Sequence, residues 1–396
     1  MRCSFALLIS VCAFGCSLKA DTYAVLPFFN ISKDKNLDWI GESVSETVAE
    51  ALASAGLVAL SRDNRIEVYH RLSIRPYALL TKASVIKIGE SLDAESVIYG
   101  QFEVTPATDL PGKSRGTLQI AARVIDLKHM NAGPEFREFG AIEDLAGLQS
   151  HLAWQALRFL MPDRSPSESD FRKRNPAVRV DALESYVRGL VAVNADEKHR
   201  LFTQAARLDP RYSQPWFHLG RLHWRKKEYT AAAEWFQKVP PNDVRYREAG
   251  FFLGLCRYHT GDFAGAQAAF QTVAGIVPLN EVYNNLGAAE SRRNLAGALD
   301  NFRKALEGDE SDPAYQFNVG YSLWRLGKFP EAAEHFRAVL DRDPSDEVAS
   351  MLLARSTARS GPRASDTRTE GLERLKTNYE ESQYWQLKAV LQAEKP

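Results

Sequence analysis

The sequence predicts an α+β protein in which a mixed-sheet α/β domain is followed by an all-α solenoid of helical repeats. Between residues 22 and 161, short apolar runs that suit strands alternate with stretches of helical periodicity. After residue 181, apolar residues recur only at helical spacing. Glycines recur in this part at separations of 34, 33 and 33 residues, at Gly220, Gly254, Gly287 and Gly320. Such self-similarity is typical of stacked helical repeats.

The composition is that of an ordinary globular protein with two or three domains. The 396 residues are 45% hydrophobic and 25% charged, and 50 Lys and Arg balance 50 Asp and Glu. A chain without net charge has no long-range field that would concentrate nucleic acid or an anionic membrane. We therefore expect no nucleic-acid partner, and recognition through shape and local contacts.

The first twenty residues have the pattern of a signal peptide. Arg2 precedes an apolar run from Phe5 to Val11, and small residues follow as far as Ala20. We expect residues 1–20 to be removed on export, with lipidation at Cys16 as the alternative. Later apolar runs are too short to span a bilayer, so the mature chain should be soluble or only peripherally attached to a membrane.

Residues 21–161 are expected to form one α/β domain. Residues 38–56 have the pattern of an amphipathic helix, and its apolar face would carry Ile40, Val44, Val48 and Leu52. The other expected elements are strands at 23–31, 57–62, 95–104 and 117–128, and helices near 64–72, 81–92 and 143–161.

This domain resembles a known family. AVLPFFNIS, GESVSETVAEALASAGLVALSR and LDAESVIYGQFEV are similar to the TolB amino-terminal-like domain, which is shared with FlgO-type flagellar and CsgG-type curli proteins. The positions that carry the likeness are Pro27, Phe28, Gly41, Ala94 and Gly100. The resemblance covers nearly all of residues 22–155 and describes a fold. It implies a periplasmic or outer-membrane-associated location and association with other envelope proteins, without fixing the partner.

A linker is expected between the two parts of the chain. Residues 162–180 are rich in Pro, Ser and charge, a composition that suits a connecting segment. The basic run FRKRN within it is interpreted as solvated surface.

The small residues of the repeats have a packing explanation. Each repeat glycine is followed by an alanine and, four residues later, by a phenylalanine; these are Ala232, Ala266, Ala298 and Ala332 with Phe236, Phe270, Phe302 and Phe336. Helices approach closely only where the contact points carry small side chains. We predict that the glycines and alanines are these contact points, and that the phenylalanines fill the space around them.

These motifs resemble the tetratricopeptide repeat. One unit carries the consensus order as Trp216, Leu219, Gly220, Tyr229, Ala232 and Phe236. About five repeats are expected between residues 181 and 345. Stacked repeats need a polar-faced terminal cap, and residues 346–396 are predicted to supply it as a degenerate helical repeat and a capping helix.

No catalytic, cofactor or metal site is predicted. None of the eight His pairs with another His or with Cys at ligand spacing, and the G-x-S-x-G elbow is absent. We therefore expect a binding protein rather than an enzyme.

The predicted binding surface is the concave groove of the solenoid, lined by the first helix of each repeat. Aromatic side chains with arginine recur on these helices, which is the composition of interface hot spots. Trp224, Tyr258 and Trp324 are expected to be exposed, whereas the phenylalanines are equally compatible with packing against the next repeat. The predicted residues are Phe217, Arg221, Trp224, Arg225, Phe251, Tyr258, Asn284, Arg292, Phe317, Tyr321 and Trp324.

Two functions fit this sequence. The first is an exported, envelope-associated scaffold that binds protein or peptide partners through the groove. The alternative makes the α/β domain the working part, as a subunit that oligomerises in an outer-membrane, surface-appendage or secretion assembly. The sequence leaves the partner, the oligomeric state and the orientation of the two domains open.

Overall fold

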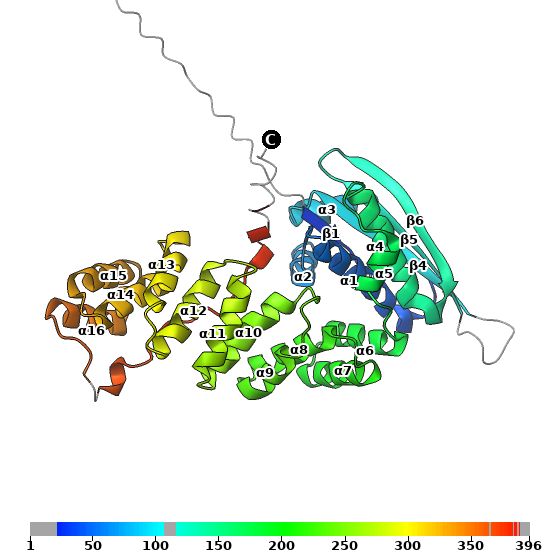
Figure 1. Ribbon diagram of the computed structural model, residues 1–396. Coiled ribbons are helices and arrows are strands. Elements are labelled where there is room, and N and C mark those ends of the chain that lie inside the picture. The colour runs from blue at the N-terminus through cyan, green and yellow to red at the C-terminus, as the bar shows by residue number, and fades with distance from the viewer. Residues whose placement is uncertain (1–21, 107–115, 364–365, 383, 386–387, 389–396) are drawn as a thin grey trace, which may run out of the picture.

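The computed structural model describes residues 22–106, 116–363, 366–382, 384–385 and 388, so the expected signal peptide lies outside it. A mixed-sheet domain leads into an arc of helices, which confirms the predicted fold class (Figure 1). None of the described helices is both long and apolar enough to cross a membrane.

The sheet of the α/β domain has the order β3-β1-β4-β5-β6, with β2 paired to β4. β1 is parallel to β3 and β4, whereas β4, β5 and β6 are antiparallel. β6 was not predicted, because this edge strand has no clear alternation and contains Pro134, which an edge strand tolerates. The strands are β1 (Thr22–Val25), β2 (Phe29–Asn30), β3 (Val58–Ala59), β4 (Ser96–Thr105), β5 (Thr117–Asp126) and β6 (Asn131–Ala141).

Helices cover both faces of this sheet. α1 (Trp39–Ser54) and α4 (Leu145–Leu160) pack on one face, and α2 (Arg62–Arg71) and α3 (Lys82–Ser91) on the other. The predicted apolar face of α1 is confirmed, because all four of its side chains, Ile40, Val44, Val48 and Leu52, are fully buried.

Helix pairs follow one another through the rest of the described chain. The first helices of the pairs are α6 (Val180–Val191), α8 (Gln214–Arg225), α10 (Tyr246–His259), α12 (Asn280–Arg292) and α14 (Pro313–Arg325). The second helices are α7 (Ala195–Leu208), α9 (Tyr229–Phe236), α11 (Phe263–Ala274), α13 (Ala298–Gly308) and α15 (Phe329–Arg342), and α16 (Glu347–Thr357) packs on the last pair.

The repeat glycines lie against the phenylalanines, as predicted. A Cβ atom added at Gly220 would stand 2.7 Å from the Phe236 ring, and one at Gly254 would stand 2.6 Å from the Phe270 ring. Real Cβ atoms do not approach this closely, so only glycine allows the two helices of a pair to meet at this distance.

The α/β domain and the first repeats share one hydrophobic core. A continuous buried cluster runs from α1 and α4 to α6, α7 and α8. The stretch predicted as a linker is packed rather than loose, because it contains α5 (Glu168–Arg174), whose Phe171 side chain is buried in this cluster. The solenoid is therefore fixed to the α/β domain.

The C-terminal cap differs from the prediction. α16 is helical, but residues 370–380 have no helix and run back along the solenoid toward its middle, where the chain is orange to red in Figure 1. Helix over residues 370–380 is a wrong expectation, because contacts with the solenoid hold this backbone extended, whereas the described residues 381, 382, 384, 385 and 388 are helical.

We expect Gly254→Ala to lower the free energy of unfolding by about 2 kcal/mol, because the added methyl group would overlap the Phe270 ring. Gly275→Ala is the control, since a Cβ there would meet only two carbonyl oxygens at 3.5 and 3.6 Å. Denaturant unfolding followed by circular dichroism measures both. Equal stability of the two variants would contradict the close-packing explanation.

Candidate functional site

The concave groove, formed by α8, α10, α12 and α14, holds the chain's own C-terminal segment (residues 366–382) along α10, α12 and α14. The segment runs from α14 back toward α10. Tyr321 of α14 donates its hydroxyl hydrogen to the Thr369 carbonyl oxygen at 2.7 Å. At the other end, Arg247 of α10 forms an ion pair with Glu381. The groove therefore holds an extended polypeptide.

Three buried asparagines bind the backbone of the segment. Asn318 Nδ2 donates to the Arg374 carbonyl oxygen, and the Arg374 N–H donates to Asn318 Oδ1, both at 2.8 Å. Asn285 makes the same pair of bonds with Lys376, also at 2.8 Å. Asn284 donates to the Arg374 carbonyl oxygen and accepts from Asn318, which joins the amides into one network. All three asparagines have no exposed surface.

A carboxylate of the segment enters a pocket between α10, α12 and α14. The Ser291 hydroxyl donates to Glu373 Oε1 at 2.6 Å, and Arg325 Nη1 lies 3.6 Å from the same oxygen. The Tyr258 hydroxyl donates to Glu373 Oε2 at 3.4 Å. The Glu373 side chain has no exposed surface. We call Ser291, Arg325 and Tyr258 the carboxylate subsite.

Other side chains of the segment meet complementary groups on the solenoid. The Arg374 guanidinium lies 3.7 Å from the centre of the Phe317 ring and forms an ion pair with Asp346. Lys376 forms an ion pair with Asp312. The Tyr379 ring lies 5.1 Å from that of Phe251. These contacts add side-chain recognition to the backbone hydrogen bonds.

The predicted groove residues fall into three groups. Those that contact the C-terminal segment are Phe251, Tyr258, Asn284, Arg292, Phe317 and Tyr321. Those that line the α8 end of the groove are Phe217, Arg221 and Arg225. Trp224 and Trp324 do neither, because each packs within the solenoid.

One of the two tryptophans corrects the sequence prediction. Trp324 was predicted to be exposed but has no exposed surface, and its Nε1–H donates to the Ser360 carbonyl oxygen at 2.8 Å. Residues that follow α16 fold over it. Trp224 is half-buried, with Phe252 and His259 ring centres 5.5 and 5.8 Å away. Trp324 is therefore not available as an anchor for a partner, whereas Trp224 keeps part of its surface exposed.

Asn284 and Tyr258 were among the predicted groove residues, but three other polar residues of the groove were not. Asn285, Ser291 and Arg325 each bind the C-terminal segment. A usable signal exists, because Asn285 and Asn318 are separated by 33 residues, which is the spacing of the repeat glycines Gly287 and Gly320, and both side chains are buried. Polar side chains repeated at the same position of successive repeats indicate a continuous recognition surface.

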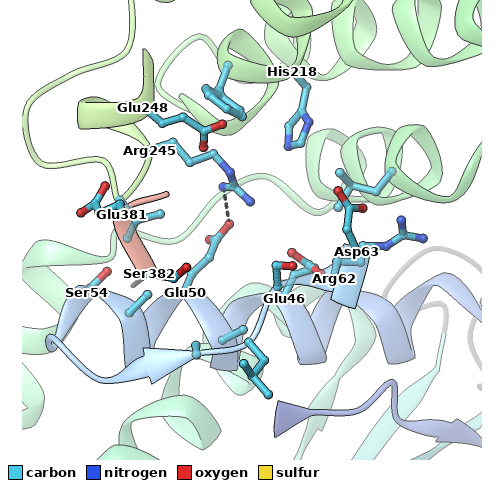
Figure 2. A pocket seen from close by; sticks show the side chains of 18 of the residues that line it. Glu46, Glu50, Ser54, Arg62, Asp63, His218, Arg245, Glu248, Glu381 and Ser382 are labelled. Carbon is cyan, nitrogen blue, oxygen red and sulfur yellow. Dashed lines mark hydrogen bonds and ion pairs between the residues drawn. The ribbon is translucent and has the colours of Figure 1, made fainter. Parts of the chain in front are cut away.

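At the α8 end, the groove opens into a cleft of about 610 Å³ between the solenoid and the α/β domain (Figure 2). Its walls come from α1, the beginning of α2, α8 and the beginning of α10, and Glu381 and Ser382 of the C-terminal segment reach its edge. Glu50 and Arg245 face each other here, and Arg245 Nη1 donates to Glu50 Oε1 at 2.9 Å. This ion pair joins α1 to the repeats.

Burial changes the acid–base behaviour of the cleft. It raises the pKa of Glu50 to about 7, although the Arg245 charge acts in the opposite direction. It also lowers the pKa of His218 well below its usual value, an effect that nearby Arg245 reinforces. His218 is therefore neutral, and its Nε2 lies 3.2 Å from the Tyr186 hydroxyl. Within the described part of the chain, no group of three or more His, Cys, Asp or Glu side chains is placed to hold a metal ion.

Comparison with known proteins identifies the repeats. Residues 199–243 and 288–347 match the model of the tetratricopeptide repeat family. Sperm-associated antigen 1 of Rattus norvegicus is 24% identical over 179 residues, which are 44% of this chain and 20% of that protein. The chain thus spans about a fifth of the length of this curated relative. The family match begins at residue 199, so the TolB-like resemblance of residues 22–155 stays a prediction.

Several solved structures are similar to part of the chain. MamA from Desulfovibrio magneticus RS-1 is 22% identical, with a TM-score of 0.36, over 39% of this chain and 88% of that one. YrrB, described as a TPR protein with an unusual peptide-binding site, is 20% identical, with a TM-score of 0.36, over 49% and 98%. PilF of Pseudomonas aeruginosa is 17% identical, with a TM-score of 0.38, over 45% and 84%.

We expect Asn285→Ala to loosen the C-terminal segment, because it removes both hydrogen bonds to the Lys376 backbone. Hydrogen–deuterium exchange of residues 372–380 should become about tenfold faster, which corresponds to the loss of one to two net hydrogen bonds. Asn378→Ala is the matched control, since this exposed segment residue bonds only Glu380 among the side-chain contacts described. Unchanged exchange in Asn285→Ala would show that the amide does not hold the segment.

The raised pKa of Glu50 predicts a pH-dependent stability. A carboxyl whose pKa is higher in the folded state stabilises the fold below its unfolded pKa of about 4.5, and this contribution is lost as pH rises through about 7. The melting temperature of the wild type, relative to that of Glu50→Gln, should therefore fall between pH 5 and pH 8. Melting curves at four pH values measure this difference, with the exposed Glu67→Gln as the control. A pH-independent difference would contradict the assignment.

Proposed function

We propose that this chain, which contains tetratricopeptide repeats, is an envelope-associated scaffold whose concave groove binds an extended segment of a partner protein. The observation that carries the proposal is the capture of backbone groups by Asn318 and Asn285. Each asparagine binds both the N–H and the carbonyl oxygen of one residue. The two bound residues are separated by one residue, so their backbone groups face the same side of an extended chain.

Backbone capture explains how the groove accepts a chain other than its own. Every non-proline residue presents one N–H and one carbonyl oxygen, whatever its side chain. A buried amide without a partner costs about 1–3 kcal/mol, so the groove favours an occupied state. An extended segment of another protein, placed in the same register, satisfies the same three amides.

The partner must displace the C-terminal segment. Because the segment is part of the same chain, it competes at a high effective concentration, and the apparent affinity for a partner falls in proportion to the fraction of open grooves. The cleft at the α8 end is the part of the groove that the described residues of the C-terminal segment leave open, and it gives an incoming chain a place to begin contact.

The envelope location rests on the sequence. The apolar run from Phe5 to Val11 follows a single positive charge, which is the pattern of an export signal. The resemblance of residues 22–155 to the TolB amino-terminal-like domain agrees with export. An interaction scaffold in that compartment would associate with other envelope proteins.

One observation favours the alternative, oligomerisation through the α/β domain. β6 is an edge strand of the sheet, and its Phe139 side chain is 74% exposed. An open edge strand with an exposed aromatic residue is a surface on which another chain can add a strand. A partner that binds there would not need the groove.

The test compares three full-length chains as baits in envelope extract. Arg374→Ala/Lys376→Ala weakens the C-terminal segment but leaves the groove intact, so it should retain at least threefold more partner than the wild type. Adding Asn285→Ala and Asn318→Ala to this variant should abolish the gain. Cross-linking mass spectrometry should place the retained protein on α12 and α14.

Two results would count against the groove. Equal retention by all three baits would contradict binding in the groove. A protein retained by all three but lost on Phe139→Lys would support the β6 edge as the working surface instead.

A further inference from the structure

We infer that the groove selects partner segments that carry an acidic side chain, which binds in the carboxylate subsite now filled by Glu373. This inference rests on the proposed function and specifies the partner's chemistry. The C-terminal segment is then an internal mimic of that partner, and its sequence shows what the groove recognises.

The subsite is built for a carboxylate. Ser291 accepts a hydrogen bond from Arg325 Nη1 at 2.8 Å and donates its own hydrogen to Glu373 at 2.6 Å. The hydrogen bond from Arg325 therefore makes the Ser291 hydroxyl a stronger donor to the Glu373 oxygen. Tyr258 donates to the second carboxylate oxygen, and burial together with the Glu373 charge raises the pKa of this phenol, which keeps it a donor. Donors thus reach both oxygens.

Burial makes the charge of the ligand decisive. The Glu373 side chain has no exposed surface, whereas 31% of the Arg325 side chain is exposed. A carboxylate removed from water must be paired with donors or a cation, and the subsite supplies both. An amide of the same shape would present one NH₂ group toward groups that are themselves donors. A glutamine at this position should therefore bind more weakly than glutamate.

The backbone clamps fix the register of the acidic residue. Glu373 directly precedes Arg374, which Asn318 binds, and lies three residues before Lys376, which Asn285 binds. Leu372 and Leu375 pack against the apolar clusters of the solenoid. The favoured partner is thus an extended segment with an acidic residue, an aliphatic residue directly before it and another two residues after it.

A glycine completes this pattern. Gly371 has φ of +67°, and a Cβ there would stand 2.0 Å from Arg292 Nη1. A side chain at this position would be strained and would also displace the arginine. We therefore expect glycine two residues before the acidic residue in the tightest-binding segments.

The test uses full-length chain as the receptor, with its own segment weakened by Glu373→Gln/Arg374→Ala/Lys376→Ala. The probes are two fluorescein-labelled peptides, TRTEGLERLKTNYEES, which is residues 367–382, and the same peptide with Gln in place of Glu373. A second receptor adds Arg325→Gln to the first. Circular dichroism and melting curves confirm that both receptors are folded, and fluorescence anisotropy gives each Kd.

We expect the glutamate peptide to bind the first receptor about tenfold more tightly than the glutamine peptide, the discrimination typical of one charged hydrogen-bonded contact. In the second receptor the two peptides should bind within about twofold of each other. This loss of discrimination, rather than of binding, is the signature of the subsite.

Other outcomes would overturn the acidic preference alone, or groove binding as well. Equal binding of the two peptides to the first receptor would overturn the acidic preference and leave groove binding intact. Binding of neither peptide to a folded receptor would contradict the proposed function as well. Sedimentation velocity shows whether the receptor dimerises. A dimer that the glutamate peptide dissociates would identify a second copy of this chain as the occupant of the groove, and would overturn the inference that a different protein binds there.

Discussion

Buried asparagine side chains that need hydrogen-bond partners determine how the C-terminal end of the chain is arranged on the solenoid. Asn284, Asn285 and Asn318 have no exposed surface, and a groove that presents such side chains is stable only when something supplies hydrogen bonds to them. The C-terminal segment supplies them with its backbone. This requirement explains why the segment is extended and why it lies along α12 and α14.

The first repeats give the groove a fixed position relative to the α/β domain. The hydrophobic core continues from α1 into α6 and α8, and the Glu50–Arg245 pair adds a polar contact between α1 and the repeats. The two parts therefore share one packed core over this region, and the cleft lies between them at the α8 end of the groove. A partner that enters the groove from this end meets both domains.

Contacts that recur in every repeat could be predicted from the sequence, whereas contacts between distant parts of the chain could not. The Gly220–Phe236 contact repeats at every helix pair, so its period revealed the fold. The groove helices were also predicted, because their register follows from the same period. Trp324 was misplaced because Ser360, 36 residues away, covers it. Residues 370–380 were expected to be helical because their local composition allows a helix, whereas hydrogen bonds to asparagines on α12 and α14 hold them extended.

The C-terminal segment of one molecule fills the groove of that same molecule. Double electron–electron resonance tests this intramolecular arrangement. One spin label is placed at Thr377→Cys, on the exposed side of the segment, and the other at Arg303→Cys, which is exposed on α13, both in a Cys256→Ala background. We expect one narrow distance distribution that an excess of unlabelled chain leaves unchanged. A broad distribution, or a distance lost on adding unlabelled chain, would contradict the claim.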